Sequence, residues 1–385
     1  MSELSYLEKL LDGVEVEWLP LGEITKYEQP TKYLVKAKDY HDTYTIPVLT
    51  AGKTFILGYT NETHGIYQAS KAPVIIFDDF TTANKWVDFD FKAKSSAMKM
   101  VTSCDDNKTL LKYVYYWLNT LPSEFAEGDH KRQWISNYSQ KKIPIPCPDN
   151  PEKSLAIQSE IVRILDKFTA LTAALTAELT AELNMRKKQY NYYRGQLLSF
   201  KEGEVEWKTL GEVAQFKRGT AITQKQTTPG EIPVVANGPI PTYFHSESNR
   251  QGETIVIARS GAYAGYVSFW NQPIFLTDAF SVHSDLKIVK PKFIYHVLQN
   301  KQEHIHAMKK GAGVPHVRVK EFETYDIPIP PITEQERIVS ILDKFDTLTN
   351  SITEGLPREI ELRQKQYEYY RDLLFSFPKP ETVSK

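Results

Sequence analysis

Hydrophobic residues in the middle of the chain recur with the period of an α-helix. Leu171, Leu175, Leu179 and Leu183 stand at every fourth position among Ala, Thr and Glu. This spacing puts the four leucines on one face and predicts an amphipathic helix. Residues 161–200 contain no proline and a single glycine, so we expect the helix to run unbroken for roughly 60 Å at ~1.5 Å per residue.

The same helical pattern occurs again near the end of the chain. Residues 161–200 align without a gap to residues 338–377, and 22 of these 40 positions are identical. Each copy follows an Ile-Pro-Ile-Pro segment, at 143–146 and 327–330. Two tandem copies of one module explain this repetition.

The two helical copies have apolar faces that must be buried. We expect them to pack on each other as an antiparallel pair; the alternative is that each packs on its own globular domain. Gly355 and Pro357 should kink or loosen the second copy. A further set of residues, mostly tyrosines, is interpreted as a partner-binding face, with phosphate contact by the same basic and aromatic runs as the alternative: Tyr190, Tyr193 and Leu197 in the first copy, and Tyr367 and Tyr370 in the second.

The repeat also closes on itself. Val-Glu-Trp followed by Leu-Gly-Glu occurs at 205–212, after the first helical copy, and at 16–23, near the start of the chain. Residues 1–18 are therefore expected to complete a helical module that begins at the C-terminus. This predicts neighbouring termini and an approximate two-fold axis.

The segments between the helical copies differ from them in pattern. Residues 19–145 and 208–325 contain short β-branched and aromatic runs, separated by turns with Gly, Pro and Asn. Each segment also has one helix-like run, at 110–118 and at 293–298. We predict two α+β domains with strongly curved sheets, which share a scaffold but differ in their loops.

The charge is distributed unevenly, although its formal sum is only −1. Residues 19–145 hold 16 Lys and Arg against 14 Asp and Glu, and residues 208–325 hold 14 against 9. The positive surplus therefore lies in the two α+β segments, as expected of domains that contact DNA. Chance variation is the alternative explanation.

The remaining composition indicates a globular protein of the cytoplasm. The 385 residues suffice for two or three domains, with 41 % hydrophobic and 25 % charged residues. No stretch approaches 18 consecutive apolar residues, and the first residues lack the pattern of a secretion signal. Cys104 and Cys147 form no metal-ligand spacing and suggest no disulfide framework.

Motifs for catalysis are missing from the sequence. Gly52-Lys53-Thr54 resembles the end of a phosphate-binding loop, but Pro47 stands where that motif needs its first glycine. Pro330-Pro331 is flanked by isoleucines and does not form the motif with which adenine methyltransferases hold a flipped base. His304 and His306 are two positions apart, which is the wrong spacing for one helix face. We expect no metal site, no cofactor and no catalysis in this chain.

Candidates for DNA contact are polar and basic residues in loops. Direct reading of bases uses Arg or Lys for guanine, Asn or Gln for adenine, and apolar contact for thymine methyl groups. Loop residues just upstream of each Ile-Pro-Ile-Pro segment stand at matching places in the repeat, which favours them. The candidates are Lys53, Thr54, Lys85, Trp86, Lys131, Arg132, Gln133 and Asn137 in the first domain, and Lys217, Arg218, Asn237, Arg259, Ser260, Tyr263, His316 and Arg318 in the second.

The whole arrangement resembles the specificity subunit of type I restriction–modification enzymes. Two variable domains alternate with two helical regions, each entered through Ile-Pro-Ile-Pro and then Gln-x-x-Ile, at Gln158 and Gln335. The repeated tetrapeptide of residues 171–183 is similar to that of the type IC branch. Arg259-Ser260-Gly261 matches a pattern frequent in the family, whereas the first domain has Asp78-Asp79 instead. The expected parts are an N-terminal helical segment 1–18, a first target-recognition domain 19–147, a central helical region 148–207, a second target-recognition domain 208–331, a C-terminal helical region 332–377 and a tail 378–385.

The resemblance implies that this chain selects the DNA target of a larger complex. Two methyltransferase subunits with S-adenosylmethionine, and restriction subunits that use ATP and Mg²⁺, would join it on double-stranded DNA away from any membrane. The target would have two dissimilar half-sites and an unread spacer, whose length we expect the tetrapeptide run to set. A stand-alone DNA-binding regulator and a fused restriction enzyme are the alternative interpretations.

Overall fold

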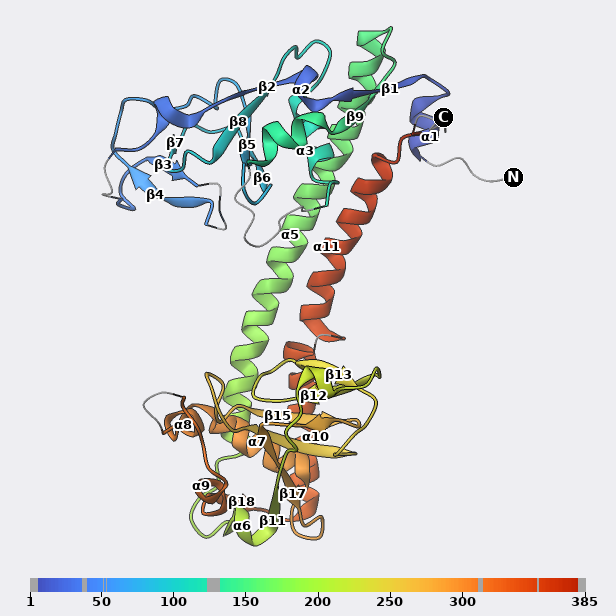
Figure 1. Ribbon diagram of the computed structural model, residues 1–385. Helices are drawn as coiled ribbons and strands as arrows, with labels where there is room; N and C mark the ends of the chain where they lie inside the picture. The colour runs from blue at the N-terminus through green and yellow to red at the C-terminus, as the bar shows by residue number, and fades with distance from the viewer. Residues whose placement is uncertain are drawn as a thin grey trace. The chain divides into compact units, whose positions relative to one another are not determined.

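The computed structural model describes residues 6–36, 40–50, 52, 54–122, 132–310, 314–351 and 353–379. The chain forms two compact units. Unit 1 comprises residues 1–176 together with 361–385, and unit 2 comprises residues 177–360 (Figure 1). Each unit therefore contains one predicted α+β domain together with parts of the helical regions. Among the described residues, no helix is long and apolar enough to cross a membrane.

Unit 1 contains a small α+β domain built from three sheets. The strands β1 (Val16–Pro20) and β9 (Lys142–Pro146) pair antiparallel. The first Ile-Pro-Ile-Pro segment, residues 143–146, therefore lies in strand β9. The four-stranded sheet has the order β2 (Thr25–Glu28), β8 (Met98–Ser103), β5 (Val74–Asp78), β6 (Asn84–Val87). The three-stranded sheet has the order β4 (Ile56–Thr60), β3 (Ile46–Leu49), β7 (Lys92–Ala93), with β3 and β7 parallel.

Unit 2 repeats this topology strand by strand. The paired strands are β10 (Glu206–Thr209) and β18 (Asp326–Ile329). The four-stranded sheet has the order β11 (Ala214–Arg218), β17 (Ala279–Ser284), β14 (Glu253–Ala258), β15 (Val267–Asn271). The three-stranded sheet has the order β13 (Tyr243–His245), β12 (Ile232–Val235), β16 (Phe275–Leu276), with β12 and β16 parallel. The prediction of two α+β domains on one scaffold is confirmed.

Short helices occupy corresponding places in the two domains. The pairs are α2 (Leu21–Ile24) with α6 (Leu210–Val213), and α3 (Leu111–Leu118) with α7 (Pro291–Asn300). Short turns of 3₁₀-helix add η1 (Pro30–Tyr33), η2 (Tyr138–Gln140) and η3 (Gln224–Gln226). The segment before the last strand carries α4 (Gln133–Ser136) in unit 1, and α8 (Gln302–Ala307) and α9 (Val319–Glu323) in unit 2.

The first helical copy is one unbroken helix, as predicted, and the second is interrupted. Helix α5 (Pro151–Leu197) contains the whole leucine run, whereas α10 (Ile332–Asn350) ends before α11 (Gly355–Leu374) begins. Gly355 has a φ of +81°, and a Cβ on it would collide with the carbonyl oxygen of Thr347. The interruption therefore requires glycine, and Pro357 fits in the first turn of α11 because its missing N–H has no helical partner there.

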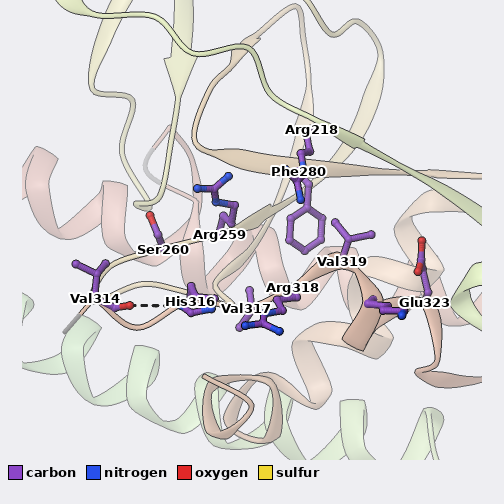
Figure 2. A pocket seen from close by; sticks show the side chains of 11 residues that line it. Arg218, Arg259, Ser260, Phe280, Val314, His316, Val317, Arg318, Val319 and Glu323 are labelled. Atoms are coloured by element: carbon purple, nitrogen blue, oxygen red, sulfur yellow. Dashed lines mark hydrogen bonds between the residues drawn. The ribbon is translucent and has the colours of Figure 1, made fainter. Parts of the chain in front are cut away.

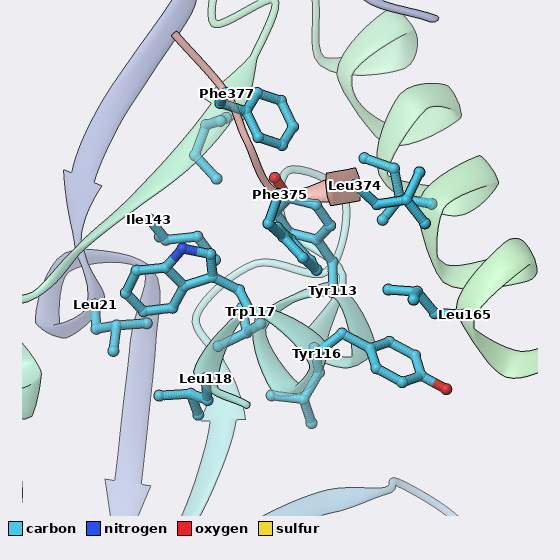
Figure 3. Close-up of a cluster of buried hydrophobic side chains, with 14 of the residues drawn as sticks. Leu21, Tyr113, Tyr116, Trp117, Leu118, Ile143, Leu165, Leu374, Phe375 and Phe377 are labelled. Atoms are coloured by element: carbon cyan, nitrogen blue, oxygen red, sulfur yellow. The ribbon is translucent and has the colours of Figure 1, made fainter. Parts of the chain in front are cut away.

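The described ends of the chain meet in the core of unit 1. Leu7 and Leu11 of α1 (Tyr6–Leu11) belong to the same buried cluster as Phe375 and Phe377, which Figure 3 shows packed among side chains of the first domain. The indole Nε1 of Trp18 donates a hydrogen bond to the carbonyl oxygen of Pro378 at 2.9 Å. The predicted closeness of the two ends of the chain is therefore confirmed for the described residues. The prediction of one helical segment over residues 1–18 was wrong at its end, because residues 16–18 belong to β1; the predicted start at 208 likewise falls inside β10.

Within each unit α5 packs both on its own domain and on the other helical copy. In unit 1 Thr169 donates a hydrogen bond to the hydroxyl of Tyr367 at 3.1 Å, and the rings of Phe168 and Tyr370 lie 5.5 Å apart. These matched pairs run in opposite directions along the two helices, so the packing there is antiparallel. Ile161 of the same helix is fully buried in the core of the first domain. Both packing alternatives that the sequence left open are therefore realised.

The predicted partner-binding face turns partly toward the chain itself. Tyr190 is only 4 % exposed and stacks on Phe345, and burial raises its pKa to about 12. Tyr190 is therefore buried within unit 2, and the partner-binding role of the set stays a prediction. Tyr193 also stacks on Phe345, and Leu197 packs against the core of unit 2. In the leucine run Leu171 is exposed, while Leu175, Leu179 and Leu183 are half-buried.

A buried glutamine attaches each domain to its helix. The carboxamide oxygen of Gln158 accepts a hydrogen bond from the backbone N–H of Leu110 at 2.9 Å, and its Nε2 donates to the carbonyl oxygen of Lys108 at 2.9 Å. Gln335 binds the backbone of unit 2 in the same way, accepting from Lys290 N at 2.9 Å and donating to Ile288 O at 3.0 Å. These are the glutamines of the Gln-x-x-Ile pattern, and both are fully buried.

A carboxylate about two turns further along each helix makes a second attachment. In unit 1 Asp166 accepts hydrogen bonds from Tyr116 Oη at 2.6 Å and from Lys112 Nζ at 3.0 Å. Burial and the hydrogen bond to this carboxylate raise the pKa of Tyr116, so its hydroxyl stays protonated and donates. In unit 2 Asp343 contacts His296 Nε2 at 2.8 Å and Lys292 Nζ at 2.7 Å.

We predict that Asp343→Asn lowers the free energy of unfolding by about 1.5–3 kcal/mol at neutral pH, because it removes hydrogen bonds to a charged group. Burial opposes ionisation of Asp343, but the hydrogen bonds from His296 and Lys292 outweigh it and hold its pKa below the ordinary value of 3.8. The contribution of Asp343 is thus present above pH 3.8 and is lost as the pH falls through its lowered pKa. Urea unfolding across pH 3–7 measures the difference between wild type and variant. Glu336→Gln, which breaks the exposed ion pair with Lys290, is the control and should cost at most about 1 kcal/mol; an Asp343→Asn effect of that size or smaller at pH 7 would contradict the attachment.

Candidate nucleic-acid interface

A hollow of about 820 Å³ in unit 2 gathers five of the eight residues predicted to contact DNA in the second domain. Three arginine side chains stand around it, with Phe280 on its wall (Figure 2). The predicted residues that line it are Arg218, Arg259, Ser260, His316 and Arg318. The surface is therefore basic, and it is open enough to receive a polyanion or the edge of a base.

Three chain segments that are distant in sequence form this hollow. Arg218 ends β11, Arg259 directly follows β14, and Arg318 directly precedes α9. Val317 N donates to the carbonyl oxygen of Arg259 at 3.0 Å, and Gly261 N donates to that of Pro315 at 2.9 Å. The backbone of the turn after β14 is thus fixed to the segment before α9, which explains why these candidates converge.

Asp278 organises the polar groups on one side of the hollow. It accepts hydrogen bonds from Ser260 Oγ at 2.5 Å and from Asn237 Nδ2 at 3.0 Å, and Arg259 Nε lies 3.5 Å from its other oxygen. The exposed Tyr263 also lies near this network. Its ring would be 4.0 Å from a Cβ placed on Gly238, which directly follows Asn237. Sequence patterns did not single out Asp278, because its partners come from two other loops, after β12 and after β14.

Lys217 is not among the residues that line this hollow. Its backbone pairs with Ser281, and its carbonyl oxygen accepts from the hydroxyl of that serine at 3.2 Å. His283 lies on the same side of the strands; burial and the charges of Lys217 and Arg250 lower its pKa. Lys217 therefore stands apart from the Arg218 cluster, and its predicted DNA contact stays a prediction.

Unit 1 has a hollow of about 640 Å³ that partly overlaps the place of the first, because its Trp134, Ile135 and Ser139 correspond to Arg318, Val319 and Glu323. Gly22 lies against Ser139 there, as Gly211 lies against Glu323 in unit 2. Gln133 N donates to the carbonyl oxygen of Asp79 at 2.8 Å, which matches the bond between Val317 and Arg259. By this match Asp79 is equivalent to Arg259, and Trp134 to Arg318.

The chemistry of the unit 1 hollow is different. Its wall includes Lys26, Tyr27, Trp134 and Ile135, none of which the sequence singled out. Ile135 is 56 % exposed and Tyr27 is 40 % exposed. The sequence signal for this site was only its place before the first Ile-Pro-Ile-Pro segment.

A fully buried ion pair lies beside this hollow. Lys99 Nζ is 3.2 Å from Asp79 Oδ2, and both side chains have no exposed surface. The other carboxylate oxygen, Asp79 Oδ1, accepts from the backbone N–H of Trp134 at 2.8 Å, and the Lys99 ammonium lies 5.1 Å from the ring centre of Tyr27. The pair therefore contacts both walls of the hollow. Phe280 occupies the position of Lys99 in unit 2, since Lys99 pairs with Phe77 and Phe280 with Ile257.

The other residues predicted in the first domain are spread over it. Arg132 and Lys85 are exposed, and Thr54 lies in the loop before β4. Trp86 packs against Tyr115 of α3 with Lys112 Nζ over its ring at 5.3 Å, so the structure gives it a packing role. Gln133 and Asn137 belong to α4 and its end, where their side chains are half-buried. Lys53 and Lys131 lie outside the described residues.

Comparison with known proteins identifies close relatives. The family model for the type I restriction modification DNA specificity domain matches residues 13–185 and 202–362. The chain is 70 % identical to the EcoR124I/EcoR124II specificity subunit of Escherichia coli over the full length of both. It is 38 % identical to the EcoprrI specificity subunit of Escherichia coli, over 92 % of this chain and 93 % of the other.

Solved structures share the fold at low sequence identity. The S subunit of a type I restriction–modification system from M. genitalium aligns with a TM-score of 0.57 and 17 % identity, over 98 % of this chain and 99 % of the other. A chain from a study of complex assembly and conformational transition of the type I R-M system aligns with a TM-score of 0.56 and 15 % identity, over 94 % and 97 %. These two likenesses concern the fold alone.

We predict that Asp79→Asn lowers the free energy of unfolding by about 3–5 kcal/mol, because it leaves the Lys99 ammonium buried without a counter-charge. The double variant Asp79→Asn with Lys99→Met should regain most of this loss, since it removes both charges. Denaturant unfolding of wild type, both single variants and the double variant measures the coupling. Additive effects of the two substitutions would show that the pair does not interact.

Proposed function

Because the chain belongs to the type I restriction–modification DNA specificity family, we propose that it selects the target of such an enzyme by reading two dissimilar half-sites, one with each domain. The observation that carries this proposal is a pair of partly overlapping hollows on one scaffold. The hollow of unit 2 is lined by three arginines, and that of unit 1 has Trp134 in place of Arg318 and adds the exposed Tyr27. Two domains that share a scaffold but present different side chains in these hollows suit the reading of two different DNA sequences.

The mode of attachment supports independent reading by the two domains. Gln158 and Gln335 bind backbone groups of their domains, so these bonds do not depend on which side chains a domain carries. A domain can therefore change its loops without losing its place on the helix. The unbroken α5, which joins the two domains in the chain, supports the further proposal that its tetrapeptide run sets the length of the unread spacer.

The proposed complex places the chemistry on other subunits. Two methyltransferase subunits would bind S-adenosylmethionine, and restriction subunits would use ATP and Mg²⁺, in the cytoplasm. The chain itself would be non-catalytic. The exposed tyrosines of the helical copies, Tyr192 and Tyr369 at 63 % each and Tyr370 at 39 %, are better placed to meet these partners than Tyr190. A stand-alone DNA-binding regulator is the second candidate, and it would retain specific DNA without any methyltransferase subunit.

We predict that replacing residues 208–325 with the second domain of another family member changes one half of the target and leaves the other half and the spacer unchanged. The reason is that each hollow is built within one domain. A donor that keeps Lys and His at positions 292 and 296 preserves both bonds to Asp343. Sequencing that detects methylated adenines in host DNA reads the outcome. A change in both halves would contradict independent reading.

A further inference from the structure

The hollow of unit 1 exposes apolar side chains, and its Trp134 stands where the hollow of unit 2 has Arg318. Ile135 and Tyr27 face it with much of their surface free, and Trp134 forms part of its wall. Neither the candidate list from the sequence nor the family resemblance assigns these residues a role. Large apolar side chains that are exposed together in a hollow are typical of a binding groove.

We propose that this hollow is the base-reading site of the first domain and that it contacts thymine methyl groups in the major groove. The inference rests on the proposed function, because it takes both hollows as DNA-facing sites. The thymine methyl is the one apolar group that the major groove displays, and apolar side chains are its natural contact. By the same rule, the arginines of unit 2 suit guanine.

The surroundings of the hollow fit a DNA ligand. Lys26 lines it, and Arg132 directly precedes the α4 turn that carries Trp134 and Ile135. Basic groups beside an apolar contact allow phosphates to be held while base edges are read. Glu23 of α2 is an acidic group that also lines the hollow, three residues before Lys26 of β2.

The buried ion pair makes the hollow a fixed surface. Asp79 holds the backbone of α4 through Gln133 and Trp134, at 2.8 Å in both bonds. Lys99 lies under the ring of Tyr27 on the other wall. Asp79 and Lys99 are thus positioning residues, which set the two walls against each other without touching DNA. Unit 2 needs no such pair, because Arg259 at the position of Asp79 is itself half-exposed toward its hollow.

The test removes methyl groups from DNA without changing its base pairing. Once the target is mapped, each thymine of the first half-site is replaced in turn by deoxyuridine, on both strands. Binding by the full chain assembled with its methyltransferase subunits is measured by fluorescence anisotropy. We expect at least one position to lose affinity by about fourfold, the value for one buried methyl-sized group.

The matching protein variant is Ile135→Ala, which should fold normally because the side chain is exposed. It should bind the thymine duplex about as weakly as wild type binds the deoxyuridine duplex, and it should no longer respond to deoxyuridine at that position. Ile56→Ala, which changes another exposed isoleucine of the same domain in β4, is the control and should keep the full response. Asp79→Asn with Lys99→Met should blunt the response without unfolding the chain.

Three results would overturn the proposal. Wild type could bind its target normally and respond to deoxyuridine at no position, or the first half-site could contain no A·T pair. Ile135→Ala could also impair assembly with the methyltransferase subunits while it leaves the deoxyuridine response intact, in which case the hollow is a protein-docking site. Loss of the proposed function itself gives a different result, since wild type would then show no preference for one DNA sequence over another.

Discussion

Two buried carboxamides, those of Gln158 and Gln335, hold the recognition domains on their helices. Each carboxamide pairs with one N–H and one C=O just before α3 or α7, so the buried polar atoms of the glutamine are satisfied. A carboxylate further along the helix, Asp166 or Asp343, completes the attachment with a lysine and an aromatic side chain. The position of each hollow follows from this attachment, because the sheet that carries it packs on α3 or α7.

The first domain is also held by residues from both described ends of the chain. The central helical region attaches the first domain at its start, and both described ends of the chain add to the core of that domain. Residues of α1 and of the segment after α11 pack in this core, where the ring centre of Phe375 lies 5.2 Å from that of Tyr113. The two ends of the chain thus stabilise unit 1 together, as the closing repeat predicted.

The sequence predicted best what depends on pattern and repetition. The unbroken α5, the break at Gly355 and the two matched domains all follow from local spacing. Arg259 and Arg318 could also be chosen from the sequence, because their segments stand next to elements that are repeated in both domains. Asp278, and the pair of Asp79 with Lys99, could not be found this way, since their contacts depend on strand register across distant segments. Trp86 and Tyr190 looked accessible, but their rings turn inward to Tyr115 and Phe345.

The central claim is that one chain carries two separate readers with different chemistry. The most direct test is to map every methylated adenine in the DNA of cells that carry the unaltered complex. The account predicts one target with two unlike half-sites separated by bases that do not matter, with at least one A·T pair in the half read by the first domain and at least one guanine in the other. A palindromic target, or one continuous sequence without an unread gap, would contradict it.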